Sequence, residues 1–158
     1  MGNEAIDGAI LERVNETDAI KVLVTIDENG APHPVVKGSI EYDNGRIALI
    51  EILESSQTNR NLTRAIWFDK PIALLLICAD RKTYKISLKA ARSVVSGKLF
   101  TSRYEKARAK YGDLDVAAAW FFEVTALRDE SIETRLQQER EERPYFNHLD
   151  RLAKKENI

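Results

Sequence analysis

The sequence predicts a β-rich α+β domain whose antiparallel strands form a closed or partly closed barrel. Most apolar segments are short and bounded by turn residues, such as 20–26 before "DENG" and 46–53 after "DNG". Helices and strands do not alternate one for one, which disfavours a doubly wound parallel sheet. Many short strands with few helices favour a barrel, because closure removes exposed strand edges.

The first third of the chain is expected to form one helix and three meandering strands. Asn3 is placed as the cap of an amphipathic helix whose apolar face carries Ile6, Ala9, Ile10 and Val14. The turn sequences "DENG" and "DNG" then separate three β-rich segments, namely 20–26, 33–42 and 46–53. These segments predict an antiparallel meander.

The rest of the chain is expected to add three strands, two helices and a helical tail. The segment 58–68 predicts a short helix carrying Leu62, Ile66 and Trp67. A bulge is expected near Ala90 and Ala91, and Gly112 is expected to cap a second helix. The remaining elements are strands at 72–79, 83–99 and 116–127, the helix at 102–112, and a charged tail at 131–158 broken by Pro144.

Composition excludes several classes of partner. The chain has 24 Lys and Arg against 25 Asp and Glu, so its net charge of -1 gives no field that favours nucleic acid or an anionic membrane. The longest apolar run, 72–79, is far shorter than the ~20 residues of a membrane span. The first residues lack the pattern of a secretory signal. A cytoplasmic protein with no membrane or nucleic-acid partner is expected.

Metal and hydrolytic sites have little support. Cys78 is the only cysteine, so an intrachain disulfide and a multi-cysteine metal site are excluded, and its apolar surroundings predict a buried, unreactive thiol. The two histidines, His33 and His148, lack metal-ligand spacing, so no metal is expected. The sequence also lacks the G-x-S-x-G, P-loop and G-x-G-x-x-G motifs.

The polar segment "ESSQTNRNL" at 54–62 is the strongest candidate site. One interpretation is structural: Ser56 or Thr58 caps the helix that follows. The other is functional: hydroxyls, amides and the first free N–H groups of the helix converge on an anion such as phosphate. The two interpretations are compatible, and both stay open.

Three phrases, in this order, resemble one known family: "KVLVTIDENGAPHPVVKG", "IALIEILESSQTNRNL" and "KPIALLLI". The family is that of the flavin mononucleotide (FMN)-binding split β-barrels related to pyridoxamine 5'-phosphate oxidase, and the resemblance covers about residues 18–130. It implies an antiparallel split β-barrel with short peripheral helices in an FMN-binding domain at 1–130. The helical extension at 131–158 would pack on the barrel or on a partner subunit, through a stripe of Tyr145, Phe146, Leu149 and Leu152.

The resemblance also implies a set of cofactor-binding residues. The phosphate and ribityl candidates are Ser55, Ser56, Gln57, Thr58 and Asn61. The backbone of Val36, Lys37 and Gly38 would run along the isoalloxazine ring, with Lys37 near its N1–C2=O edge; a solvated strand lysine is the alternative for Lys37. Many relatives carry Lys or Arg where this chain has Gln57, so the helix terminus with Arg60 or Arg64 would have to supply the charge.

The implied function is that of a homodimeric flavoprotein with FMN at the subunit interface. Its chemistry would be that of a flavin-dependent oxidoreductase acting with a small-molecule redox partner, and the sequence identifies no catalytic residue or substrate. Two alternatives stay open. One is a heme- or deazaflavin-binding split barrel, and the other is a non-catalytic domain whose charged C-terminal helices bind a partner protein.

Overall fold

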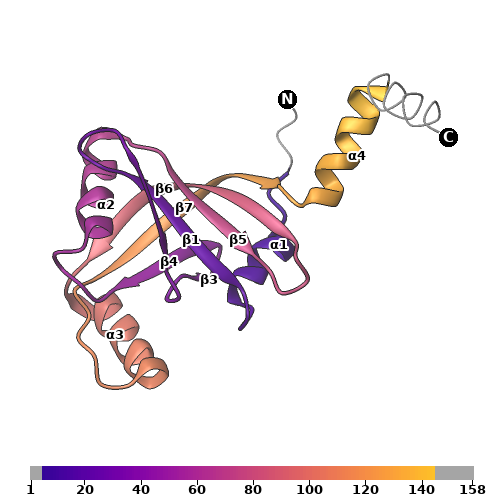
Figure 1. Ribbon diagram of the computed structural model, residues 1–158. Helices are drawn as coiled ribbons and strands as arrows, with labels where there is room; N and C mark the ends of the chain where they lie inside the picture. The colour runs from indigo at the N-terminus through magenta and orange to yellow at the C-terminus, as the bar shows by residue number, and fades with distance from the viewer. Residues whose placement is uncertain (1–4, 145–158) are drawn as a thin grey trace.

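The computed structural model describes residues 5–144, which form one antiparallel seven-stranded sheet with peripheral helices (Figure 1). The strand order is β2-β1-β5-β6-β7-β4-β3. The strands are β1 (Ile20–Ile26), β2 (Pro32–Val36), β3 (Glu41–Asp43), β4 (Arg46–Glu51), β5 (Ile72–Ile77), β6 (Thr83–Val94) and β7 (Ala118–Asp129). The helices are α1 (Gly8–Glu12), a 3-10 turn η1 (Arg13–Asn15), α2 (Gln57–Phe68), α3 (Gly97–Tyr111) and α4 (Ile132–Glu142).

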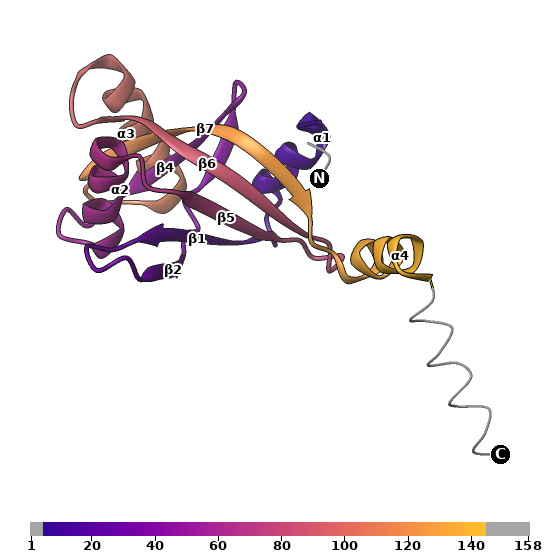
Figure 2. The same cartoon turned by 90° about the horizontal axis from the view of Figure 1, so that it is seen from above.

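The connection between the two edge strands forces the sheet to curl. β2 ends at Val36 and β3 begins at Glu41, yet these strands lie at opposite ends of the strand order. Laid flat, seven strands would separate the outer two by about 29 Å, six spacings of ~4.8 Å. The five residue steps from Val36 to Glu41 reach at most about 18 Å. The sheet therefore wraps into a barrel that stays split between β2 and β3 (Figures 1 and 2), which confirms the predicted fold class.

The long strands β6 and β7 supply the bend. They pair from Tyr84 opposite Asp129 to Val94 opposite Ala119, and the register shifts twice along the way. One shift lies between Ala90 and Arg92, so the predicted bulge is confirmed. Bulges increase the local twist of a strand pair, and they allow the two strands to follow the wall of a narrow barrel.

Apolar side chains from both halves of the chain fill the barrel. Of the aromatic run 119–124, Trp120 and Phe122 belong to this core, whereas Phe121 is buried in a separate small cluster with Ala48 and Ala119. Helix α2 packs on β1 and β6, and the indole Nε1 of Trp120 donates to Asn59 Oδ1 at 2.9 Å. The fully buried aliphatic residues include Leu23, Ile47, Leu49, Leu62, Leu74, Leu76 and Ile86.

Three local predictions need correction. The first helix is shorter than expected, because Asp7 accepts a hydrogen bond from the N–H of Ala9 and caps a helix that begins at Gly8; Asn3 lies outside the described residues. The segment 33–42 is not one strand, because its middle residues cross the split. It gives β2 and β3, so the sheet has seven strands rather than six, and the expected three-strand meander is wrong.

Other boundaries are close to those expected. Helix α2 has the predicted position, and Leu62 is buried, whereas Ile66 and Trp67 are exposed. Helix α3 begins at Gly97, five residues before the predicted start, and Gly112 caps its end as expected. No helix among residues 5–144 combines the length and hydrophobicity that crossing a bilayer requires.

Helix α4 projects away from the barrel, at the end opposite α2 and α3 (Figures 1 and 2). None of its residues is buried, and Ile132 and Leu136 are exposed. The apolar stripe from Tyr145 to Leu152 lies outside the described residues. Packing of the extension on the barrel or on a partner subunit stays a prediction.

If the short crossing between β2 and β3 holds the barrel together, its one buried side chain should matter for stability. Ile40 is 1% exposed, and Ile40→Ala should lower the free energy of unfolding by ~2–5 kcal/mol, because it leaves a cavity under the crossing. Val95 is 66% exposed, and Val95→Ala should change the stability by less than ~0.5 kcal/mol. Urea denaturation measures both, and equal losses would contradict the role given to Ile40.

Candidate functional site

Residues 37–40, which we call the seam, bridge the split between β2 and β3. The N–H of Lys37 donates to the carbonyl oxygen of Lys21 on β1 at 2.9 Å. The Ser39 hydroxyl donates to the carbonyl oxygen of Ile50 on β4 at 2.7 Å. The seam is therefore tied to one strand on each side of the split, and cavities lie along it.

A buried ion pair lies beside the seam. Lys37 Nζ is 2.8 Å from Glu51 Oε2, and the two side chains are 16% and 1% exposed. Glu51 Oε1 also accepts a hydrogen bond from the N–H of Leu53 at 3.1 Å. The Lys37 ammonium is therefore not a solvated strand lysine, and part of its charge is already balanced within the chain.

An apolar pocket of about 310 Å³ opens at the same place. Val36, Ile52 and Leu53 lie at its mouth with exposed fractions of 64%, 49% and 60%. The remaining lining residues are Lys37, Gly38, Ser39, Ile50, Glu51, Tyr111 and Leu114. A small apolar pocket with a few polar groups is typical of ligand sites, and adjoining exposed apolar side chains are typical of a surface that another molecule covers.

The polar turn follows directly from the pocket wall, since Ser55 comes two residues after Leu53. Ser56 caps α2, because its Oγ accepts a hydrogen bond from the N–H of Asn59 at 3.0 Å. Arg60 donates from Nη1 to the Ser55 carbonyl at 2.8 Å and from Nη2 to Gln57 Oε1 at 2.6 Å. The first helical amides and the Arg60 guanidinium therefore lie together at this turn.

Thr58 and Asn61 lie on the inner face of α2 rather than on the surface of the turn. Both are buried, at 1% and 0% exposure, because positions 58, 61, 62 and 65 share the helix face that packs on the sheet. Asn61 Nδ2 donates to Thr25 Oγ1 at 3.0 Å, and Gln57 Nε2 donates to Asn61 Oδ1 at 2.6 Å. Their binding to a phosphate or ribityl group stays a prediction.

Arg64 is separate from this turn. Its guanidinium lies over the Phe68 ring, with 5.5 Å between Cζ and the ring centroid. Its Nε is buried and has no hydrogen-bond partner among the described residues. Of the two arginines expected to compensate for the neutral Gln57, only Arg60 contacts the turn.

Pocket and turn together fit the two ends of FMN. The apolar walls suit a flat tricyclic ring, and the Gly38 and Ser39 backbone borders that pocket. The hydroxyls of Ser55 and Ser56, the side-chain amide of Gln57, the first amides of α2 and the Arg60 guanidinium are groups that bind phosphate.

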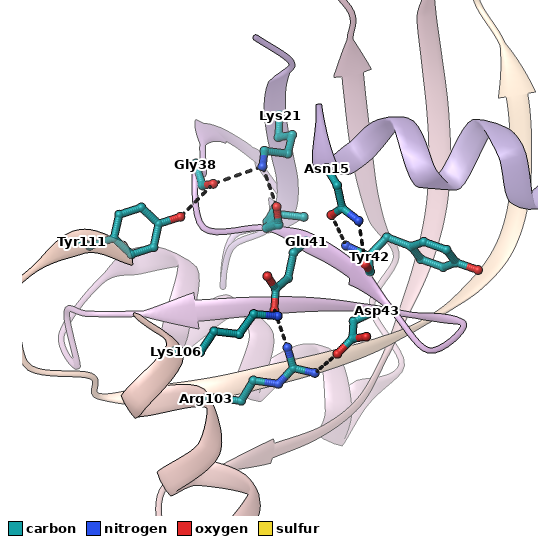
Figure 3. Close-up of polar contacts among 10 residues, drawn as sticks. Asn15, Lys21, Gly38, Glu41, Tyr42, Asp43, Arg103, Lys106 and Tyr111 are labelled. Carbon is teal, nitrogen blue, oxygen red and sulfur yellow. Dashed lines mark hydrogen bonds and ion pairs between the residues drawn. The ribbon is translucent and has the colours of Figure 1, made fainter. Parts of the chain in front are cut away.

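A larger cleft of about 790 Å³ lies on the other side of the contact between Gly38 and Tyr111. The Tyr111 hydroxyl donates to the Gly38 carbonyl at 3.4 Å, and Figure 3 shows Tyr111 and Lys21 converging on that oxygen. Lys21 and Tyr111 both line the cleft. Gly38 of the seam lines the cleft and the apolar pocket, so the seam lies between the two cavities.

Lys21 is the functional candidate that the sequence analysis missed. It is only 8% exposed, and its Nζ donates to the carbonyl oxygens of Gly38 at 3.1 Å and Ile40 at 2.5 Å. Burial, with a contribution from the positive charge of Lys110, lowers the pKa of Lys21 from its ordinary value. Period-two alternation in "IKVLVTI" puts Lys21 on the inward face with Leu23 and Thr25, which was the available signal.

Ion pairs hold α3 against the far wall of this cleft. The Arg103 guanidinium bonds to Glu41 and, at 2.9 Å, to Asp43 Oδ2. Lys106 Nζ lies 3.2 Å from the same Glu41 carboxylate (Figure 3). The acidic residues of β3 are therefore already paired with cations of α3.

The described part of the chain offers neither a reactive thiol nor a metal-binding cluster. Cys78 is buried at 4% exposure, and burial raises the pKa of its thiol, which agrees with the predicted unreactive role. Residues 5–144 contain no cluster of three or more His, Cys, Asp or Glu side chains suited to a metal ion.

Comparison with known proteins identifies the fold. No protein-family model and no curated protein sequence matches the chain. Among solved structures, HupZ of Group A Streptococcus superposes with a TM-score of 0.65 and 17% identity, over 81% of this chain and 96% of that one. An FMN-binding protein from Syntrophomonas wolfei gives 0.58 and 13% identity, over 71% and 77% of the two chains.

Further matches have the same architecture. A pyridoxamine 5'-phosphate oxidase-like protein from Lactobacillus delbrueckii gives a TM-score of 0.58 and 17% identity, over 80% and 95% of the two chains. An F420 reductase and the heme storage protein HutZ from Vibrio cholerae match at 0.58 and 0.54. The resemblance to the FMN-binding split barrels is therefore confirmed for the fold.

The ion pair beside the seam allows a double-mutant test. Lys37→Met should cost ~3–5 kcal/mol of stability, because it leaves the Glu51 carboxylate buried without a counter-charge. Replacing both residues by Met should recover much of that loss, since no charge is then left unpaired. Urea denaturation of the two variants decides, and a double variant less stable than Lys37→Met alone would contradict this account.

Proposed function

We propose that this protein is an FMN-binding flavoprotein that works as an oxidoreductase on a small-molecule redox partner. The observation that carries the proposal is the placement of the apolar pocket beside the turn at Ser55–Gln57, where Arg60 brings a positive charge. The isoalloxazine ring would lie in the pocket along Val36, Lys37 and Gly38, and the phosphate would lie at the turn. The names of two structural neighbours, an FMN-binding protein and a pyridoxamine 5'-phosphate oxidase-like protein, agree with it.

Heme is the second candidate, because the neighbour HutZ is a heme storage protein. Heme iron needs an axial His, Cys, Met or Tyr ligand. Of the described residues that line the apolar pocket, Tyr111 is the only one of these types. A deazaflavin, suggested by the F420 reductase, would use the same apolar walls. Heme would therefore depend on Tyr111, whose hydroxyl already donates to the Gly38 carbonyl, whereas a flavin-type ring needs no such ligand.

The residues of the chain would bind and orient the cofactor rather than react themselves. A bound flavin supplies the redox chemistry. Lys37 would place a positive charge next to the ring edge where negative charge develops on reduction, and its pairing with Glu51 would moderate that charge. The described residues at the pocket include no cysteine or histidine, so no catalytic residue is assigned.

A homodimer is part of the proposal. Val36, Ile52 and Leu53 expose apolar surface at the mouth of the pocket, and a second copy of the chain is the surface that would cover them and shield the ring. This matches the shared site that the resemblance implies.

The phosphate end is tested with FMN and riboflavin, which differ only in the phosphate. Arg60→Gln should weaken FMN binding by about tenfold or more, because a hydrogen bond to a charged group is worth ~1.5–3 kcal/mol, and should leave riboflavin binding unchanged. Arg64→Gln is the matched control on the same helix, and it should affect both ligands equally. Quenching of flavin fluorescence measures each affinity.

Gln57→Lys supplies the opposite change, since it adds a cation at the turn and should tighten FMN relative to riboflavin. If Arg60→Gln weakens both flavins equally, the arginine acts through folding and the phosphate site is wrong. Failure of the unaltered protein to bind FMN, together with a Soret band on adding hemin, would favour the heme candidate.

The dimer is tested by light scattering. Leu53→Asp should convert the dimer to a monomer and release flavin, because it places a charge in the proposed interface. Val95→Asp changes an equally exposed apolar residue away from the pocket and should leave the mass and the flavin content unchanged. A monomeric unaltered protein that still binds FMN would contradict the shared site.

A further inference from the structure

The larger cleft contains a buried positive charge that the flavin proposal does not use. Lys21 lies in its wall, with the ammonium group facing the seam (Figure 3). An ammonium group has three N–H donors, and two of them are used by the carbonyls of Gly38 and Ile40. Both acceptors are neutral, so the charge itself has no counter-ion in these two contacts.

Three of the four acidic residues that line the cleft are committed to other cations, and one of them, Glu16, is paired with Arg13. Glu41 is bonded to Arg103 and Lys106, and Asp43 is bonded to Arg103. No carboxylate of the described residues lies within ion-pair distance of Lys21. Burial of this charge is costly, and the only attraction from the cleft is that of the Glu41 carboxylate, which opposes the lowering of the Lys21 pKa without lying within ion-pair distance among the described residues. An anion from outside the chain would therefore stabilise the ammonium group.

A second cation faces the same space. Lys110 lines the cleft at the end of α3, and its charge is close enough to contribute to the lowered pKa of Lys21. Its Nζ lies 5.2 Å from the centre of the Tyr111 ring, and no carboxylate of residues 5–144 lies within ion-pair distance of it. Two lysines that repel one another across a cleft are both stabilised by one anion between them.

We propose that this cleft binds a small organic carboxylate, with Lys21 holding the carboxylate group from the cleft wall and Lys110 from its rim. The Tyr111 ring lies beside Lys110 and would give the organic part of the molecule an aromatic surface. A volume of about 790 Å³ is within the range that holds small organic ligands.

The charge of the lining favours a carboxylate over a polyanion. Glu12, Glu16, Glu41 and Asp43 also line the cleft, so a phosphate dianion or a longer polyanion would meet four carboxylates. Lys106, the third lysine that lines the cleft, is already engaged by Glu41. The remaining N–H donor of Lys21 and the ammonium group of Lys110 together suit a ligand group with a single negative charge.

This inference is independent of the flavin proposal. Gly38 and Tyr111 are shared by the two cavities, but Lys21 and Lys110 line only the cleft, whereas Leu53 and Glu51 line only the apolar pocket. A carboxylate in the cleft would bind whether or not a flavin occupies the pocket.

The experiment is a titration of the full-length ¹⁵N-labelled protein with sodium benzoate, sodium acetate and sodium phosphate, followed by amide chemical shifts. Saturable shifts with benzoate and acetate are expected at Lys21, Gly38 and Tyr111, with weaker binding of phosphate. Lys21→Met, which keeps the length of the side chain, should weaken benzoate binding about tenfold or more.

Lys110→Gln keeps Lys21 and should weaken benzoate binding severalfold, so the proposal remains testable if Lys21→Met fails to fold. Lys98→Gln makes the same change at an exposed position at the start of α3, outside the cleft, and should have no effect. Three results would overturn the proposal: no saturable shifts with either carboxylate, phosphate binding as tight as benzoate, or equal effects of Lys110→Gln and Lys98→Gln.

Discussion

The short connection between β2 and β3 is the constraint on which the rest of this structure depends. Four residues, 37–40, must join the two outer strands of a seven-stranded sheet, and they reach only if the sheet curls. The curl creates the barrel core, and the crossing itself is held by Ile40 inside and by hydrogen bonds to β1 and β4. Both cavities border the crossing, so the segment that permits the fold also forms walls of both candidate binding sites.

Three charged side chains that are largely removed from solvent, Lys21, Lys37 and Glu51, lie beside this crossing. Lys37 and Glu51 compensate one another on the side of the apolar pocket, whereas Lys21 has only carbonyl partners on the side of the cleft. Burying ions costs stability compared with apolar residues of the same size, and such groups often mark sites that bind something. We therefore propose different ligands on the two sides of the crossing, a flavin ring beside the balanced pair and a carboxylate beside the unbalanced lysine.

Short-range sequence patterns predicted the elements whose formation depends on neighbouring residues. Strands β1, β4 and β5, helix α2 with its Ser56 cap, and the bulge in β6 follow from alternation, capping and turn chemistry within a few residues. The break at the seam was not predicted, because "HPVVKGSIEY" is compatible with a continuous strand until the whole sheet closes. The partners of Lys37 and Lys21 were not predictable either, since Glu51 and the Ile40 carbonyl lie 14 and 19 residues away in the chain. The resemblance indicated the turn at Ser55–Gln57, but only the packing of α2 separates exposed Arg60 from buried Thr58 and Asn61.

The central proposal is that the cofactor binds at the split in the barrel. Hydrogen exchange of backbone amides, measured by mass spectrometry with and without FMN, tests it directly. The account predicts slower exchange on both sides of the split, in 36–39 and in 50–58, with little change in β6 or α4. Unchanged exchange in both segments under saturating FMN, or protection confined to a different part of the barrel, would contradict it.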